Sequence, residues 1–554
     1  MISKADFDFD NYSSSENKNF HVTLIRTPAV STSSSISISS IAPSLALAYL
    51  SGTLRKCRFS VTNIDSIGED IRNISAIPHI PGMTYQGLSA EKIITRIPQK
   101  TNLIGVSCMF SSEWVYTKQI INLIRNAFPS IPVIAGGEHV TAIPEFVLED
   151  CQAIDVVVLG EGEATLVELA YSIHNQQEID NIKGLVIRKN RGLLRTGFRK
   201  RIANINDIQW PAWDMLPIDN YLSLGLSHGP YRGKTMPIMA SRGCPYQCTF
   251  CSNQAMWTTL WSPRDVEDVV REIQYYKENY DATSIEFYDL TTIINKKWIL
   301  KFCDLLIKEK VNILWQVSGG TRTEAIDEEV IQKLVQSGCK YLGFAPESGS
   351  REVLREIKKK VDLDRMVSLF RIANKYDLNT RSNFVIGFPN DTRRKIFTTL
   401  LFQIKLAFMG VIDSPIFIFT PYPGSELFQL LKEESLIQNY DDRYFNSLGL
   451  DLKINSGKGY CLHVKPTELF IYQMSGMIMF YGVYYLTHPL QLLRFINSII
   501  SKGNTSSVFE QRIILSITKR FMRYGMKKEK SHGRVDVSSE RRKLGDIRHG
   551  ARQR

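Results

Sequence analysis

Three of the nine cysteines of this 554-residue chain fall within eight residues of one another, in the segment 241–251. Cys244, Cys248 and Cys251 can converge in one loop, because the glycine before the first cysteine and the proline after it interrupt helical geometry. Three thiolates in one loop suit a cubane iron–sulfur cluster in which one iron lacks a protein ligand. The iron without a protein ligand would be a place for chemistry.

A structural zinc site is the alternative for the same cysteines. Such a site needs four ligands at paired spacing, whereas the next cysteine downstream is Cys303 and the nearest upstream histidine is His228. An odd number of mostly isolated cysteines also argues against a disulfide framework and for reduced thiols. The spacing therefore favours the iron–sulfur cluster.

At these cysteines the chain resembles the radical S-adenosylmethionine (SAM) superfamily. The resemblance implies that SAM chelates the fourth iron and that one-electron reduction, by a flavodoxin- or ferredoxin-type partner, gives a 5′-deoxyadenosyl radical. That radical would remove hydrogen from an unactivated carbon of a small-molecule or lipid-like substrate. Holding the substrate in place while excluding water and oxygen is then the main task of the protein.

Four further positions match this superfamily more loosely, and the resemblance implies cofactor contacts for them. Phe250 matches an aromatic position near the adenine, and Asp289 ends a predicted strand near the methionyl amine. Glu347 matches a polar contact at another strand end, and Gly387 would let the backbone approach the adenine closely. The structural alternatives are a core aromatic for Phe250 and a cap or turn for the other three.

The elements that must position the cysteine loop alternate between short β-branched runs and amphipathic helical stretches. Six β/α units in about 190 residues predict a partial (β/α)6 barrel, too short for eight units. The cysteine loop follows the first strand, at the end of such a sheet where ligands bind. Strands are expected at residues 236–240, 284–288, 313–317, 341–345, 383–386 and 416–419.

A second alternating series precedes the barrel and predicts a doubly wound, Rossmann-like α/β domain. Strands are expected at 21–25, 103–106, 133–135 and 156–159. Glycine-rich loops, 135–141 and 159–165, follow the last two. Neither is a dinucleotide fingerprint, because the glycine spacing is wrong and the acids in the loops would repel a pyrophosphate. A large, amide-rich, weakly charged ligand is a better match.

With the segments 42–50 and 105–110, these loops resemble the cobalamin-binding domain that precedes many radical SAM barrels; the resemblance spans roughly residues 20–430. No histidine lies between His21 and His79, so cobalamin is expected to bind without a protein histidine ligand; a domain that merely supports the barrel is the alternative. A second departure is that residues 257–263 lack the arginines common before this Ser-Pro in the family. The resemblance implies cofactor contacts for Ser107, Gly136, Gly137, Glu138, Gly160, Glu161, Gly162, Glu163 and Thr165.

The net charge of +12 is unevenly placed. Residues 501–554 hold fifteen basic and five acidic side chains, a balance of +10, so the body of the protein is not a nucleic-acid-binding surface. Between Glu468 and Arg494 no residue is charged, a length that could span a bilayer. Glycine, histidine and proline interrupt this stretch, which favours a buried or interface-lying helix over a span. The favoured role of this apolar stripe is a lid on the core. An apolar stripe next to a basic tail also suits anionic membrane surfaces, so a peripheral membrane contact is a second possible role.

The predicted organisation has five parts, from a polar N-terminal segment to a basic disordered tail, and no secretory signal, which predicts a cytoplasmic protein. Cobalamin-dependent methylation of an unactivated carbon is the leading function. Radical cyclisation or oxidative ring formation would use the same parts, and a non-catalytic cobalamin-responsive binding module is an alternative of another class. The intact cysteine triad argues against the module, because a sensor needs no reducible cluster. The parts are 1–19, a cobalamin-binding-like domain with its linker over 20–221, the barrel over 222–430, a helical C-terminal cap over 431–526, and the tail over 527–554.

Overall fold

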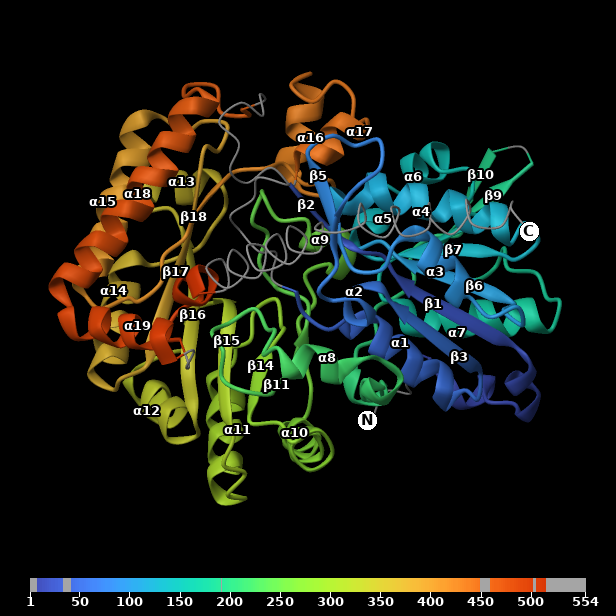
Figure 1. Cartoon of the computed structure of the whole chain (residues 1–554), viewed down its shortest axis with the longest axis horizontal. Helices are drawn as coiled ribbons and strands as arrows, with labels where there is room; N and C mark the ends of the chain where they lie inside the picture. Colours follow the sequence, from blue (N-terminus) through green and yellow to red (C-terminus); the bar gives the residue numbers. More distant parts are fainter. Residues whose placement is uncertain (1–6, 33–40, 191, 449–458, 502–504, 515–554) are drawn as a thin grey trace, which may run out of the picture.

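The computed structural model describes residues 7–32, 41–190, 192–448, 459–501 and 505–514. Two α/β units lie side by side, and further helices follow at the C-terminal end (Figure 1). The predicted basic tail over 527–554 lies outside the described residues.

The N-terminal unit is built on a seven-stranded sheet in the order β10-β9-β8-β7-β6-β1-β3. The order β3-β1-β6-β7-β8 of its parallel strands is that of a doubly wound sheet, which confirms the predicted Rossmann-like domain. An antiparallel hairpin, β9 and β10, extends one edge. The strands are β1 (His21–Arg26), β3 (Ser60–Asp65), β6 (Leu103–Ser107), β7 (Val133–Gly136), β8 (Val156–Val158), β9 (Leu185–Lys189) and β10 (Gly192–Arg195).

The order of these strands also fixes where a ligand can bind. The chain starts at β1, moves outward to β3 and then returns to β6 on the other side of β1. A crevice opens at such a reversal point, outside the carboxyl ends of the two strands. The residues after β1 and β6 therefore border the natural ligand site of this unit.

Helices cover both faces of the N-terminal sheet. α1 (Leu45–Lys56) and α7 (Gly162–His174) pack against each other, and their apolar residues belong to one hydrophobic cluster. The Ser44 hydroxyl caps α1 by accepting the Leu47 N–H, which places the start of this helix at the crevice. A second cluster includes α3 (Ala90–Arg96), α4 (Trp114–Ala127), α5 (Glu138–Ala142) and α6 (Pro144–Asp150). Smaller elements are α2 (Ser66–Glu69), α8 (Ile218–Ser223) and a three-stranded sheet of β2 (Ala29–Thr32), β5 (Met83–Gln86) and β4 (Ile74–Ala76).

The second unit is a six-stranded parallel sheet in chain order, as the sequence predicts for a partial barrel. Large buried side chains such as Trp315, Phe344 and Phe370 fill the space between its strands and helices. The strands are β11 (Thr235–Ile238), β14 (Ser284–Phe287), β15 (Leu314–Thr321), β16 (Cys339–Glu347), β17 (Asn379–Ile386) and β18 (Ile416–Ile418). The helices are α10 (Val266–Tyr280), α11 (Lys296–Lys308), α12 (Glu328–Gln336), α13 (Arg351–Glu356), α14 (Leu363–Lys375) and α15 (Arg393–Phe408).

The C-terminal helices divide between the two units. α16 (Glu426–Glu433) and α17 (Asp442–Ser447) follow the last barrel strand, and α17 contacts α4 of the N-terminal unit, where Lys118 Nζ lies 2.7 Å from an Asp442 carboxylate oxygen. α18 (Pro466–Thr487) packs along α15 and β18, and α19 (Pro489–Ser501) follows it. The described C-terminal helices therefore contact both units, while the bounds predicted for the cap, 431–526, stay a prediction.

Among the described residues, α18 is the one helix long and apolar enough to cross a membrane. Its residues Leu469, Gln473, Gly476 and Phe480 form a buried stripe along one side. The Gln473 amide also donates to the Ile416 carbonyl of β18 at 2.8 Å. One side of α18 therefore packs against the barrel.

Candidate functional site

The cysteine loop follows the first barrel strand, and a short pair of antiparallel segments, which we call the neck, joins its two ends. β12 (Ser241–Arg242) pairs antiparallel with β13 (Ser262–Pro263), so the two ends of the loop are held together. Gly243 has φ +83°, and a Cβ there would lie 2.0 Å from the Leu260 carbonyl oxygen. Only glycine fits this neck. The loop also contains the short helix α9 (Asn253–Trp257).

The three cysteines of this loop differ from most of the others in exposure. Cys244 and Cys248 are half-buried and Cys251 is exposed, whereas five of the remaining six are buried. Cys251 nevertheless lies among many protein atoms, and this burial raises its pKa to about 12, with Glu138, Cys248 and Cys244 acting in the same direction. The Cys251 thiol is therefore protonated at neutral pH, and binding a metal cluster must displace its proton.

The donor set fits a cubane cluster better than a single ion. Among the described residues, no group of three or more His, Cys, Asp or Glu side chains is placed to hold one metal ion. A zinc ion would draw four ligands to about 2.0–2.3 Å, while a cubane spreads three cysteines over three irons. Three cysteines without a fourth ligand therefore keep the iron–sulfur cluster as the favoured prediction.

Asp289 fixes the start of the cysteine loop. It is buried just after β14, and its carboxylate accepts the Ala240 N–H at 3.1 Å and the Ser241 hydroxyl. Burial raises the pKa of Asp289 to about 6, although these hydrogen bonds oppose the shift. In the structure this residue orders the backbone that leads into the loop.

Glu347 ends β16 in a strained conformation on the other side of the loop. Its φ is +65°, uncommon for a residue with a side chain, and its buried carboxylate pairs with Lys359 at 2.8 Å. Burial raises the pKa of Cys248, while Lys359 and Arg322 oppose that shift and Glu347 adds to it, so all three lie near this thiol. Sequence reasoning missed Lys359 and Arg322, because neither lies in a recognisable motif.

Phe250 lies beside the residue that follows Gly387. The ring of Phe250 lies 5.6 Å from that of Phe388, the residue after Gly387. Gly387 has φ +83°, and a Cβ there would lie 2.8 Å from Leu469 of α18. The space that glycine leaves there is therefore taken by a C-terminal helix.

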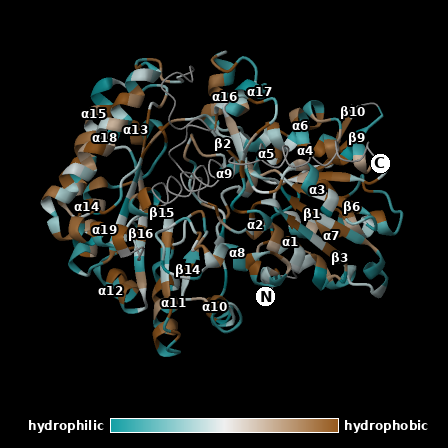
Figure 2. Ribbon diagram, viewed as in Figure 1, coloured by the Kyte–Doolittle hydropathy of each residue, from teal (hydrophilic) through white to brown (hydrophobic). Residues whose placement is uncertain are grey.

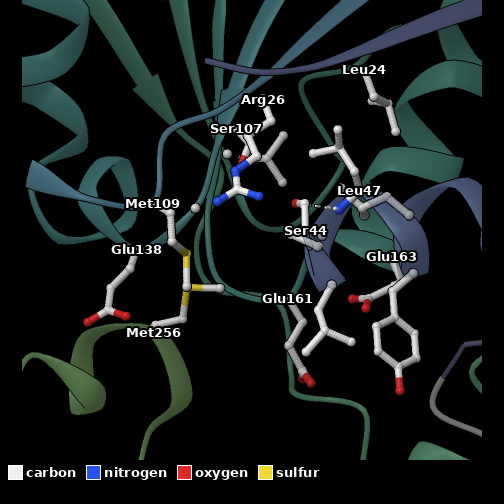
Figure 3. Close-up of a pocket in the computed structure, with 18 of the residues that line it drawn as sticks. Leu24, Arg26, Ser44, Leu47, Ser107, Met109, Glu138, Glu161, Glu163 and Met256 are labelled. Carbon is white, nitrogen blue, oxygen red and sulfur yellow. Dashed lines mark hydrogen bonds between the residues drawn. The ribbon is translucent and has the colours of Figure 1, made fainter. Parts of the chain in front are cut away.

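A cavity of about 360 Å³ lies between the two units, at the crevice expected from the strand order. Figure 3 shows Arg26, at the end of β1, extending among the labelled residues of this cavity. His228, Met239 and Tyr288 line it from the barrel side. Eight of the nine N-terminal residues predicted to contact a cofactor line it as well, namely Ser107, Gly136, Gly137, Glu138, Gly160, Glu161, Gly162 and Glu163.

The glycines keep this cavity open. A Cβ at Gly136 would lie 3.8 Å from Val158 and one at Gly160 would lie 3.7 Å from the Met256 carbonyl oxygen, which are ordinary contacts, so a side chain could be added there without a clash and would occupy part of the cavity. The lining is mostly apolar, with a few hydroxyl, amide and charged groups, which suits a large ligand of weak charge. Thr165 does not line the cavity; it is buried within α7.

Two acids of the glycine-rich loop belong to a buried charge network. Arg242 contacts Glu161 at 3.1 Å and Glu163 at 2.6 Å, and Arg201 contacts Glu161 at 3.3 Å. The side chains of all four are at most 7% exposed. Burial would raise the pKa of Glu163, but the Arg242 guanidinium holds it below its usual value.

Arg242 links the two candidate cofactor sites. It stands two residues before Cys244, and its guanidinium also lies over the rings of Tyr49 at 5.1 Å and Trp257 at 5.8 Å. Glu161 and Glu163, two of the three acids predicted as ligand contacts, are therefore neutralised by arginines, one of them from the segment that holds the cysteines. Sequence reasoning missed both arginines, since their partners lie 40 to 81 positions away.

Comparisons with known proteins agree with this division into two units. Residues 35–170 match the B12 binding domain family, and residues 238–402 match the radical SAM superfamily. The chain is 30% identical over 414 residues to the uncharacterized methyltransferase PH0819 of Pyrococcus horikoshii, covering 74% of this chain and 83% of the relative. It is 24% identical over 408 residues to the anaerobic magnesium-protoporphyrin IX monomethyl ester cyclase of Cereibacter sphaeroides, covering 72% of this chain and 62% of that enzyme.

The fold is also similar to that of a solved structure. The cobalamin-dependent SAM radical enzyme OxsB, solved with aqua-cobalamin and SAM bound, superposes with a TM-score of 0.62 at 16% identity. The match covers 90% of this chain and 71% of OxsB. The two-unit arrangement with its C-terminal helices is therefore a known architecture.

Proposed function

The chain belongs to the radical SAM superfamily and carries a B12-binding domain, and from this premise we propose that it methylates an unactivated carbon of a small-molecule substrate in a cobalamin-dependent reaction. The observation that carries the proposal is the shared cavity. Residues predicted to contact cobalamin line it on one side, and barrel residues that follow the first two strands line it on the other. A substrate in this space could meet both cofactors.

Cys244, Cys248 and Cys251 would hold a 4Fe–4S cluster, and SAM would complete it. When bound, cluster and SAM supply one-electron chemistry at an unactivated C–H bond, and cobalamin supplies a methyl group. Asp289 and Arg242 fix the two ends of the β12 strand that leads to the cysteines. The protein residues would thus contribute to the reaction by placing the cysteine loop next to the cavity between the two units.

Other residues of the site would orient SAM and shield the reacting carbon from water. Glu347 and Lys359 present a paired carboxylate and ammonium near Cys248, and Phe250 with Phe388 gives an aromatic wall. We propose that these groups contact SAM at its polar and adenine ends, as the superfamily resemblance implies. The apolar lining of the cavity would exclude water from the reacting carbon.

Ring formation is the second candidate, and the similarity to the cyclase of Cereibacter sphaeroides favours it. Both reactions begin with removal of the same kind of hydrogen, so they differ only in what happens to the substrate carbon afterwards. The two candidates make different predictions for the methyl group of SAM, which a methylase transfers to the substrate and a cyclase does not.

The test is anaerobic reconstitution with iron, sulfide and cobalamin, followed by reduction through flavodoxin or ferredoxin. Small-molecule extract from a strain lacking the gene supplies the substrate pool, and SAM carries a trideuteromethyl group. We expect 5′-deoxyadenosine and a product that has gained the labelled methyl group. Deoxyadenosine with an unlabelled, ring-closed product would support the cyclase instead.

Replacing the three cysteines by alanine gives the matched control. The variant should lose its iron and all deoxyadenosine formation, while it keeps cobalamin uptake, because none of the three cysteines lines the cavity. A wild-type protein that takes up cobalamin but no iron, and forms no deoxyadenosine, would refute the enzymatic proposal and support the binding module.

A further inference from the structure

The outer side of the C-terminal helices is apolar. On α18, Ile471, Ile478 and Leu486 are 62%, 67% and 83% exposed. On α19, Leu490, Leu493 and Ile500 are 70%, 61% and 76% exposed. We call these six residues the outer apolar face; Figure 2 shows the two helices at the edge of the molecule.

The pattern of α18 is not that of a helix that simply covers a barrel. Its buried stripe, Leu469, Gln473, Gly476 and Phe480, occupies one side, and Ile471 and Ile478 stand about half a turn away from it. A helix between a core and water has a polar outer side, and a helix that is apolar all round has a partner on both sides. The outer side of α18 therefore calls for a second apolar environment.

The orientation of α19 also indicates that this side of the molecule contacts an apolar partner. Ser498 is buried on this helix, while Leu490, Leu493 and Ile500 point outward. The Ser498 hydroxyl donates to the Phe495 carbonyl at 2.7 Å, so its burial costs little, whereas leaving two leucines and an isoleucine in water forgoes the transfer free energy of three apolar side chains. Phe397, Leu401 and Phe408 of the adjacent helix α15 are also more than half exposed.

A strongly basic segment starts next to this face. After α19 the chain returns to the barrel, where Phe509 stacks on Tyr481 of α18 at 3.7 Å and Tyr485 bonds to Glu510. Residues 515–554 then hold thirteen basic and four acidic side chains, a balance of +9. The described residues from which the basic segment continues, 505–514, are therefore attached to α18, one of the two helices that carry the outer apolar face.

These observations identify the partner by its chemistry. We propose that the outer apolar face docks on an anionic lipid bilayer, with the basic segment binding the headgroups. Apolar insertion and a polybasic segment are the two signals that together give stable peripheral binding. A second copy of the chain is a poorer partner, because a symmetric interface would bring two segments of +9 charge together. This inference is independent of the reaction that the enzyme catalyses.

The test is flotation of the full chain with vesicles, in low and high salt. Vesicles of phosphatidylcholine with a third phosphatidylglycerol should bind the chain, and pure phosphatidylcholine vesicles should bind it at least about tenfold more weakly. Replacing Leu490, Leu493 and Ile500 by serine should lower partition on the order of 100-fold. A matched control replaces three exposed apolar residues elsewhere, Leu123, Ile307 and Leu430, and should leave partition unchanged.

Leu493→Trp provides a second readout that needs no loss of binding. Its fluorescence should shift to the blue when anionic vesicles are added, because the ring enters the apolar layer. Wild-type chain that stays unbound at low salt, or a serine variant that binds as well as wild type, would overturn the proposal. So would a dimer that the serine variant dissociates, without any vesicle binding.

Discussion

Replacing Arg242 by methionine should destabilise the N-terminal unit strongly. The guanidinium contacts Glu161 at 3.1 Å and Glu163 at 2.6 Å, in a site where no side chain is more than 7% exposed. Arg201 still pairs with Glu161 in the variant, but Glu163 is left buried without a cation. Removing one partner of a buried pair costs about 3–5 kcal/mol, which lowers the unfolding midpoint by roughly 10 °C.

A second substitution isolates the cause. If the cost arises from the uncompensated carboxylate, changing Glu163 to glutamine in the Arg242→Met background should restore at least half of the lost stability. The matched control is Arg55→Met, because Arg55 pairs with Asp214 at 2.5 Å while both are about half exposed. Exposed pairs of this kind contribute about 0–1 kcal/mol. The measurement is guanidinium unfolding of each variant at pH 7.

The same experiment has a pH signature with a definite sign. In wild type the pKa of Glu163 is lowered, so its contribution is present at neutral pH and is lost as the pH falls through the folded-state value. Without Arg242 the buried carboxyl should have a raised pKa, and its penalty disappears on acidification. The stability gap between wild type and Arg242→Met should therefore narrow from pH 7 to pH 5. A gap no larger than that of Arg55→Met, or one independent of pH, would refute this account of the network.

Three further changes test the rest of the site. Gly136→Leu places a side chain in the open cavity, so cobalamin uptake should fall at least about tenfold while iron content stays unchanged; equal uptake would argue against this binding site. Gly387→Ala introduces a Cβ at φ +83° and 2.8 Å from Leu469, and should cost about 1–3 kcal/mol in thermal unfolding. Asp289 has a pKa raised to about 6, so wild type should gain stability relative to Asp289→Asn as the pH falls from 7 to 5 in denaturant titrations.

The fold could be predicted from the sequence because its signals are local. Each barrel strand is a short, mostly apolar run that a helix follows, and the six expected strands are the six that form the sheet. The reversal of the N-terminal sheet was not predicted, because it depends on β3, which is not among the strands expected from the sequence. The division of the C-terminal helices could not be predicted, since the position of α17 depends on contacts such as that of Lys118 with Asp442, 324 residues apart.

The cavity could be predicted only in part. The glycines that follow β7 and β8 are visible in the sequence, and their missing side chains do keep the space open. Glu161 and Glu163, the acids beside these glycines, are also visible in the sequence. The residues that they contact cannot be read from the sequence. The linear sequence predicts that Glu161 and Glu163 face solvent or a ligand, because no residue near them in the chain carries a compensating charge.

Arg242, which neutralises Glu161 and Glu163, lies in the same segment as the three cysteines, 241–251. The function expected for this segment, cluster binding, gave no reason to look for a separate role of its arginine. Arg242 is two residues from a proposed cluster ligand and bonded to the loop that lines the proposed cobalamin cavity. Because a buried guanidinium between two carboxylates is held rigidly, it fixes the distance between the loop and the cavity wall more firmly than apolar packing would. In the proposed reaction one substrate carbon must be reached from both cofactor sites, which depends on that distance, so the network is as much a part of the site as the cysteines are.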